Sequence, residues 1–462
     1  MFQVFASLPR TPRHRSCAFG SPPSPHRPAT VPPSYSVDLF AGCGGLSLGL
    51  RKAGFDTLLF SEVNAAAAET FETNLGAPGV GGVGGVDALT TDVLDGLLKE
   101  WRNQGKEVDL VTGGPPCQGY SGIGHRRSHV VEREAIPSNH LFLRMIEVIK
   151  ALEPKLFLFE NVRGLLSGRW RKGGKSGEIW NDVRSGFRSL RGYETGWKLV
   201  YSKDFGVPQN RPRILLVGAH CDLGLDLGDD RADDPIDNPR GLIPSGAARA
   251  PDLRDVLGDL VDQAYLGKDA TTRYLHSAKS DFQRAMRVDR HGRRLRKGAR
   301  LTEQEYTRHS DRIRRKFAHM IRTGEIPPRM ITRKFAQRVL PKRWSEHGPT
   351  ITVTSLPDDF VHYSQPRILT VREWARLQMF PDWFEFRGPR TTGGHRRAGS
   401  PSDGVWDREV PKYTQIGNAV PVGLAEAVGL HLKSLLSKEG VVPSRPVDQV
   451  RDEGRGLHPV RL

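Results

Sequence analysis

Short apolar segments alternate with helical segments between residues 35 and 220. The apolar segments predict strands at 37–40, 57–62, 90–92, 108–112, 156–159 and 214–218, and the helical segments span 46–52, 65–74 and 141–152. Strands that alternate with helices favour a mostly parallel sheet with helices on both faces. Residues 156–159 are apolar at every position, as in a strand that is buried on both faces. The sequence therefore predicts an α/β fold with a doubly wound sheet.

A basic and irregular stretch interrupts this alternation between residues 221 and 350. Residues 273–343 carry 22 Lys and Arg against 6 Asp and Glu, a net +16 of the chain's total of +17. A solvated helical surface usually mixes both signs, so this excess favours contact with a polyanion, with a solvated surface as the alternative. The alternation resumes with helices predicted at 370–379 and 424–437. We therefore predict a second, smaller and mostly irregular domain inserted over 221–350.

Neither end of the chain has the composition of a folded core. Residues 1–34 contain eight Pro, four Arg and no acidic residue, which predicts a disordered arm. Residues 438–462 are polar and contain Pro, and we expect a loose tail.

The cysteines and the apolar runs narrow the class of protein. Four cysteines stand far apart and form no CxxC pair, which argues against a zinc site and against a disulfide framework. We therefore expect no metal, and a location in the reducing cytoplasm. No run of eighteen apolar residues occurs, so we also expect no membrane span.

One cysteine lies in a stiff turn directly after a predicted strand. Residues 113–121 read Gly-Gly-Pro-Pro-Cys-Gln-Gly-Tyr-Ser, so two prolines fix the backbone before Cys117 and the glycines let it bend. A lone cysteine in a loop is more often a small buried hydrophobe. A thiol held at the end of a strand is instead placed for nucleophilic attack.

Six segments, in their order and spacing, closely resemble the DNA cytosine-5 methyltransferase family. They are residues 37–50, 113–121, 156–162, 208–214, 367–381 and 415–421. The resemblance covers residues 35 to about 220 and about 350 to 430. It implies a Rossmann-like S-adenosylmethionine-dependent methyltransferase sheet, with a catalytic domain made of 35–220 and 351–437. The insertion at 221–350 stands where the family has its target recognition domain.

The resemblance implies catalytic roles for Cys117, Glu160, Arg211 and Arg213. Cytosine carbon 5 is a poor nucleophile, and attack of a thiolate on carbon 6 makes it reactive. Cys117 would be that nucleophile, and Glu160 the general acid at ring nitrogen N3. Arg213 matches the residue that contacts the cytosine, and Arg211 and Gln209 match supporting positions. The two arginines alternate along an extended segment, so we expect them to point to opposite faces.

A cofactor pocket for S-adenosylmethionine is implied by the same resemblance. A glycine-rich turn that follows a strand and opens a helix suits a nucleotide-like ligand. Glu62 would bind the ribose hydroxyls and Asp92 the adenine amino group, each at the end of a predicted strand. Cys43, within the turn, is expected to be a packed small residue. The implied cofactor contacts are Phe40, Gly42, Gly44, Glu62, Asp92, Pro116, Leu141, Asn418 and Val420.

DNA contacts are expected from two further segments. Enzymes that modify a base take it out of the duplex, and residues 121–136, with glycines and arginines, resemble a mobile loop that closes over DNA. The helix within 367–381 is expected to brace the two domains. Residues 385–412 form an additional insertion that either contacts DNA or is solvated. Ser138 stands where the family often has an arginine, which puts a supporting contact in doubt.

The function implied is that of a DNA cytosine-5 methyltransferase acting on double-stranded DNA, as the modification half of a bacterial restriction–modification pair with a cognate restriction endonuclease. We expect a monomer. One alternative is a tRNA cytosine-5 methyltransferase, against which the large basic insertion argues. The other is an inactive DNA-binding member of the family, against which the intact Cys117, Glu160 and Arg213 argue.

Overall fold

The computed structural model of the protein describes residues 33–77, 79–116, 137–225, 241–331, 337–345, 348–351, 357–391 and 409–437. The described residues from Ser34 onward form one compact unit. The predicted arm and tail lie outside the described residues, except that Ser34 already belongs to the first strand. The predicted division of the rest into catalytic and recognition domains stays a prediction.

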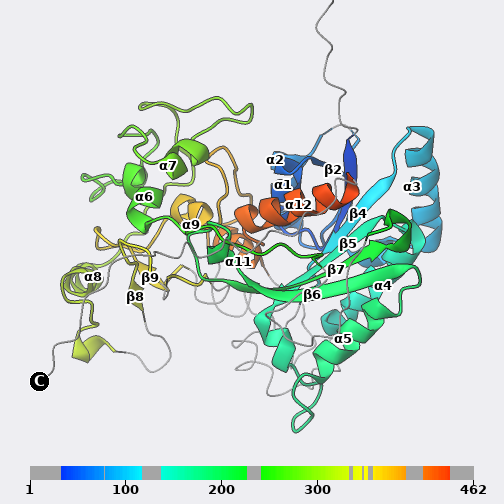
Figure 1. Ribbon diagram of the computed structural model, residues 1–462. Coiled ribbons are helices and arrows are strands. Elements are labelled where there is room, and N and C mark those ends of the chain that lie inside the picture. The colour runs from blue at the N-terminus through cyan, green and yellow to red at the C-terminus, as the bar shows by residue number, and fades with distance from the viewer. Residues whose placement is uncertain are drawn as a thin grey trace, which may run out of the picture. The chain divides into compact units, whose positions relative to one another are not determined.

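A seven-stranded sheet forms the centre of the described structure, in the order β3-β2-β1-β4-β5-β7-β6 (Figure 1). The strands from β1 to β5 pair in parallel, and β7 runs antiparallel to both β5 and β6. The predicted mostly parallel sheet is thus confirmed. The strands are β1 (Ser34–Leu39), β2 (Phe55–Ser61), β3 (Gly81–Val83), β4 (Val108–Gly113), β5 (Leu156–Val162), β6 (Tyr193–Tyr201) and β7 (Pro212–His220).

Helices connect these strands and cover both faces of the sheet. Those of the sheet region are α1 (Gly45–Lys52), α2 (Ala65–Leu75), α3 (Thr91–Asn103), α4 (Leu141–Leu152) and α5 (Glu178–Arg188). Residues 253–323 add α6 (Leu253–Leu257), α7 (Asp281–Met286) and α8 (Asp311–Thr323), followed by the strand pair β8 (Arg338–Val339) and β9 (Phe360–Val361). The last helices are α9 (Val371–Leu377), α11 (Lys412–Asn418) and α12 (Val422–Leu436).

The strand order reverses between β1 and β4. From β1 the chain builds outward through β2 to β3, and it then returns to add β4 and β5 on the other side of β1. In open α/β sheets, ligands bind beyond the carboxyl ends of the strands at such a reversal. The ends of β1, β2, β4 and β5 are therefore where a site is expected.

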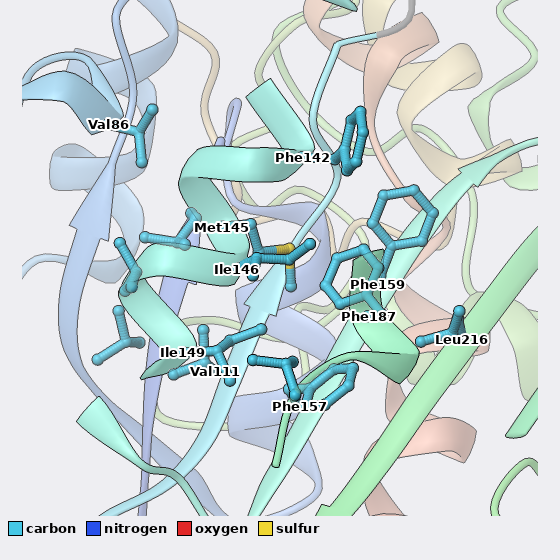
Figure 2. Close-up of a cluster of buried hydrophobic side chains, with 14 of the residues drawn as sticks. Val86, Val111, Phe142, Met145, Ile146, Ile149, Phe157, Phe159, Phe187 and Leu216 are labelled. Atoms are coloured by element: carbon cyan, nitrogen blue, oxygen red, sulfur yellow. The ribbon is translucent and has the colours of Figure 1, made fainter. Parts of the chain in front are cut away.

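Strand β5 shows how the sheet is buried on both faces. Phe157 and Phe159 pack with α4 and α5, as Figure 2 shows, whereas Leu156 and Leu158 pack on the opposite face with residues of α1 and α12. This alternation follows from the two-residue period of a strand.

One predicted strand is wrong. Residues 90–92 do not form a strand, because Thr90 caps α3 and Asp92 lies in the first turn of that helix. The third strand lies earlier, at Gly81–Val83. The amphipathic pattern of α3, which buries Leu94 and Trp101, explains the difference.

Residues 253–306 pack against 360–386 through a second core that contains buried charges. Arg376 donates to Asp259 (2.5 Å) and Asp382 (2.6 Å), and all three side chains are fully buried. Arg367 forms a similar buried pair with Glu373 (2.6 Å). The predicted helix at 370–379 is thus present as α9, and its contacts are structural.

One stretch of the described residues, Lys412–Leu436, has the length and apolar composition that a membrane span would need. It consists of α11 and α12, which are separated by Ala419–Pro421, and 56% of its most apolar window is buried inside the protein. A Cβ on Gly49 of α1 would come 2.4 Å from Cβ of Ala425. This close packing is typical of a core helix.

Candidate active site

The glycine-rich turn after β1 is shaped by close contacts. Gly42 and Gly44 have positive φ angles of 56° and 89°. A Cβ on Gly44 would lie 2.5 Å from Cδ1 of Leu75, and a Cβ on Gly45 would lie 2.6 Å from the carbonyl oxygen of Val420. The positive φ angles thus favour glycine at 42 and 44, and the contact with backbone excludes a side chain at 45. The structure thereby brings this turn against residues 419–420, which are predicted pocket residues from the other end of the chain.

Glu62 closes the turn from the neighbouring strand end. Its carboxylate accepts hydrogen bonds from the backbone N–H of Gly42 (2.9 Å) and of Asn64 (2.7 Å). Burial raises the pKa of Glu62 above its ordinary value. Each carboxylate oxygen keeps a further lone pair, so Glu62 can still accept hydrogen bonds from ligand hydroxyls.

Asp38 is a buried carboxyl that the sequence interpretation missed. It accepts hydrogen bonds from Ser47 of α1 and from Thr112 of β4 (3.0 Å). Burial, partly offset by these hydrogen bonds, raises the pKa of Asp38 from 3.8 to about 6. Asp38 therefore ties the first strand to the helix and strand on either side of the turn. An acidic residue inside the apolar run Val37–Phe40 was the available signal.

The chain that leads to Cys117 is held against Glu160. The Nδ2 atom of Asn161 donates to the carbonyl oxygen of Pro115 (3.1 Å), and a Cβ on Gly114 would lie 2.9 Å from Oε2 of Glu160. The end of β4 thus lies beside the Glu160 carboxylate at the end of β5. Cys117 itself, and the predicted loop 121–136, lie outside the described residues.

Glu160 forms an ion pair with Arg213 across the antiparallel pair of β5 and β7. Their side chains are only 10% and 6% exposed. A carboxyl group and a guanidinium side by side supply a group that can transfer a proton and a fixed positive charge. The pair therefore has the composition expected of an acid–base centre.

Arg211 makes different contacts from Arg213. It is buried, and it donates to the backbone carbonyl oxygens of Ile351 and of Gly417 (2.5 Å). Gln209 is also buried and binds Gln378 and the carbonyl of Leu377. Arg211 and Gln209 thus hold backbone segments that are far apart in sequence.

The remaining predicted cofactor contacts divide into two groups. Phe40 has a positive φ of 58° and is partly buried beside the turn, and Leu141 is partly buried at the start of α4. Pro116 and Asn418 are exposed, at the end of the described part of the 113–121 segment and at the end of α11. Cys43 is buried as predicted, and burial raises the pKa of its thiol to about 12.

Asp92 does not occupy the position from which its role was predicted. It is exposed on α3, and no strand ends there. The acidic residue that follows β3 is Asp87, in a short 3-10 helix at Val86–Ala88, with a side chain that is 79% exposed and 3.3 Å from Arg144. Asp87, rather than Asp92, is thus the acidic residue that follows β3, as Glu62 follows β2.

The basic stretch 273–343 separates into buried and exposed arginines. Helix α8 packs Phe317 and Met320 against β8, β9 and Ile368, whereas Arg312, Arg315 and Arg322 are exposed. Arg287, in contrast, is buried against Tyr274. Part of the charge of this stretch therefore stabilises the fold, and contact of the exposed part with a polyanion stays a prediction.

Comparisons with known proteins agree with this architecture. Residues 35–434 match the family of C-5 cytosine-specific DNA methylases. The chain is 30% identical to the Type II methyltransferase M.DdeI of Desulfomicrobium norvegicum, over 85% of this chain and 86% of that protein. It is 31% identical to the Type II methyltransferase M.XorII of Xanthomonas oryzae pv. oryzae, over 88% and 86%.

A solved structure shares the fold. It is that of a prophage-encoded E. coli protein described as a DNA modification methyltransferase, and it aligns with a TM-score of 0.60 and 24% identity over 88% of this chain and 100% of that one. The family match covers most of the chain and both relatives cover more than two thirds of it. This chain therefore belongs to the family of C-5 cytosine-specific DNA methylases, and it is a DNA cytosine-5 methyltransferase.

Proposed function

We propose that this enzyme transfers a methyl group from S-adenosylmethionine to carbon 5 of cytosine in one specific double-stranded DNA sequence. We further propose that this methylation protects host DNA from a cognate restriction endonuclease, as the names of its Type II relatives suggest. The observation that carries the chemistry is the Glu160–Arg213 pair, which lies beside the backbone that leads to Cys117. In this proposal the chain is a cytoplasmic monomer.

The residues at the ends of β1 and β2 fit S-adenosylmethionine. A Cβ built on Gly42 would meet no atom within 4 Å among the described residues, so a ligand can approach the backbone of this turn, and Glu62 offers carboxylate lone pairs for ribose hydroxyls. Asp87, which follows β3, replaces Asp92 as the acceptor for the adenine amino group. The bound cofactor supplies an electrophilic methyl group. Phe40, Leu141 and Val420 would provide apolar contacts around it.

The proposed chemistry begins with the Cys117 thiolate. Its sulfur forms a bond to carbon 6 of cytosine while the ring electrons move toward N3, where Glu160 donates a proton. Arg213 holds Glu160 in place and contacts the base. Carbon 5, now enamine-like, accepts the methyl group. Loss of the carbon 5 proton to water then restores the double bond and expels the thiolate, and the N3 proton returns to Glu160, so that the enzyme is regenerated.

Access to the base requires that the cytosine leaves the duplex, at a cost of about a few kcal/mol. In the proposal, loop 121–136 closes over the DNA and the block 221–350 recognises the sequence. The end of that block is tied to the segment before β7, because the carbonyl of Pro349 accepts from the backbone N–H of Asn210 (2.8 Å). The exposed arginines of α8 are the proposed phosphate contacts.

Bisulfite sequencing of plasmid DNA from cells that express this chain tests the proposal. Cytosines that resist conversion within one short repeated sequence would support it and identify the recognition site. Cys117→Ser should abolish this protection while cofactor and DNA binding persist. If the soluble wild-type enzyme protects no cytosine in DNA, the same assay on tRNA would test the alternative substrate.

A further inference from the structure

A basic pocket lies in the recognition block, away from the residues assigned above to catalysis and cofactor binding. It has a volume of about 700 Å³ and is lined by Ser277, Arg284, Arg287, Arg294, Arg296 and Lys297, together with the small or apolar Ala278 and Leu295. Five of the eight lining residues are cations and none is acidic. Such a concentration of one sign is costly in the absence of an anion, because like charges repel.

Arg287 is a buried member of the pocket lining and is held in place by several contacts. Its guanidinium lies 3.9 Å from the ring centroid of Tyr274, and Nη1 donates to the carbonyl of His276 (2.7 Å) and faces Asp259 (3.3 Å). The side chain is only 1% exposed. Its Nε and Nη2 atoms have no hydrogen-bond partner among the described residues. Buried donors are rarely left without a partner, so the unpartnered Nε–Nη2 edge of this buried guanidinium points to a ligand oxygen.

The acidic groups nearby do not neutralise the pocket. Asp259 pairs with both Arg287 and Arg376, so its one negative charge cannot balance both of these buried cations. Asp281 pairs with Arg284 at the surface (2.6 Å), and Asp289 pairs with Arg293 (2.6 Å), which does not line the pocket. Arg294, Arg296 and Lys297 are exposed at the rim. The pocket therefore keeps a positive excess.

We propose that this pocket binds a phosphate group, held by the unpartnered Nε and Nη2 atoms of Arg287 and by the exposed cations Arg294, Arg296 and Lys297. A planar guanidinium with two free donors suits a tetrahedral oxyanion, and the rim charges add long-range attraction. The phosphate can belong to a DNA backbone, which extends the function proposed above, or to a small free anion. Both sources present the same chemistry to the pocket.

The test compares Arg294→Gln/Lys297→Gln with Lys99→Gln/Arg102→Gln, a control of equal charge change on the exposed face of α3. In the DNA arm, fluorescence anisotropy measures duplex affinity against salt concentration. A DNA phosphate in the pocket predicts that the pocket variant lowers the steepness of the log–log salt dependence by about 1 to 2, and the control does not. Arg287→Lys, which keeps the charge beside Asp259 but loses the planar guanidinium with its paired N–H donors, should weaken binding similarly.

In the second arm, inorganic phosphate at constant ionic strength is added in a thermal unfolding experiment. A free-anion site predicts that phosphate raises the unfolding temperature of wild type and control more than that of the pocket variant. General salt effects act on all three proteins alike. If wild type and pocket variant respond identically in both arms, the proposal is overturned. Bisulfite protection by wild type, measured in parallel, shows separately whether the methyltransferase function holds.

Discussion

The sheet region and the region of residues 253–386, which contains part of the proposed recognition block, use charged side chains in opposite ways. In the sheet region the two helix-covered layers are apolar, and buried carboxylates such as Asp38 and Glu160 lie toward the carboxyl ends of strands, around the site. Between 253 and 386, arginines and carboxylates are themselves part of the core, as in the Arg376 pairs with Asp259 and Asp382. Buried charge thus gathers near strand ends in one region and forms part of the core in the other.

This difference has a physical reason. Residues 253–306 contain long irregular segments and short helices, so few regular apolar faces are available to pack. Arginine can reach several carbonyl and carboxylate oxygens at once, as Arg372 does with Thr302, Pro381 and Phe384. Such contacts fix irregular backbone that lacks the regular hydrogen bonds of a helix or a sheet. A buried network of this kind is costly to disrupt, because each member depends on the others.

The largest expected effect on stability comes from Arg376→Met. The change leaves Asp259 and Asp382 buried without their shared cation, which should cost about 3–5 kcal/mol of unfolding free energy. Urea denaturation measures this loss. Arg308→Met, at an exposed pair with Asp269, is the control and should change little. Equal losses in the two variants would mean that the buried network has no special structural role.

Glu160→Gln tests the other side of the comparison. It removes the proton donor but keeps the shape of the side chain, so methyl transfer should slow by about 10²-fold or more. DNA binding should weaken far less, because the recognition block is unchanged. Single-turnover rates and duplex affinities measure the two quantities. Parallel losses in both would assign Glu160 to folding rather than to chemistry.

Much of the sheet region could be predicted from the sequence because its signals are local. The apolar period of Leu156–Phe159 and the helix at Leu141–Leu152 are found where they were expected. Strand β3 was missed because two of its three residues are glycine. Strand β6, Tyr193–Tyr201, was missed because polar residues interrupt its apolar positions. Its pairing with β7 decides its conformation, and this pairing is not a local property.

The buried arginines could not be predicted in the same way. Arg376 and Asp259 are 117 positions apart, and arginine is usually exposed, so neither residue carries a local sign of burial. For the site, motif order indicated Glu160 and Arg213, and the structure shows them paired. Asp87 was missed because the glycine-rich segment before it carries no apolar pattern from which the end of β3 could be recognised.

The pH dependence of stability should differ between the two regions. Burial raises the pKa of Asp38 to about 6, so the folded state holds this proton more tightly than the unfolded chain, and the contribution of Asp38 to stability falls as pH rises from about 4 to about 6. Burial alone would raise the pKa of Glu373, but Arg367 outweighs it and lowers the value to about 2. The stability from Glu373 is therefore lost as pH falls from about 4.5 to about 2.

Asp38→Asn isolates the first of these effects. It should flatten the decline in unfolding free energy between pH 4 and 6 by up to a few kcal/mol, as measured by urea denaturation at several pH values. Asp56→Asn, at an exposed position of the neighbouring strand β2, is the matched control and should leave the profile unchanged. A profile for Asp38→Asn that follows the wild type would show that Asp38 keeps its ordinary titration in the folded protein.

The smallest expected effect concerns the charges that the recognition block leaves exposed. Helices α3 and α8 have 13 residues each, and each presents two exposed cations three positions apart, Lys99 and Arg102 in one and Arg312 and Arg315 in the other. If exposed charge in the recognition block serves DNA, Arg312→Gln/Arg315→Gln should weaken duplex binding at low salt and make its log–log salt dependence less steep by about 2, whereas Lys99→Gln/Arg102→Gln should do neither. The stability of both variants should stay near that of wild type, because no buried partner is lost. Equal salt dependence in the two variants would mean that the exposed cations of α8 do not contact DNA. The two regions would then differ only in their buried charges, and DNA contact would have to come from other residues of the block.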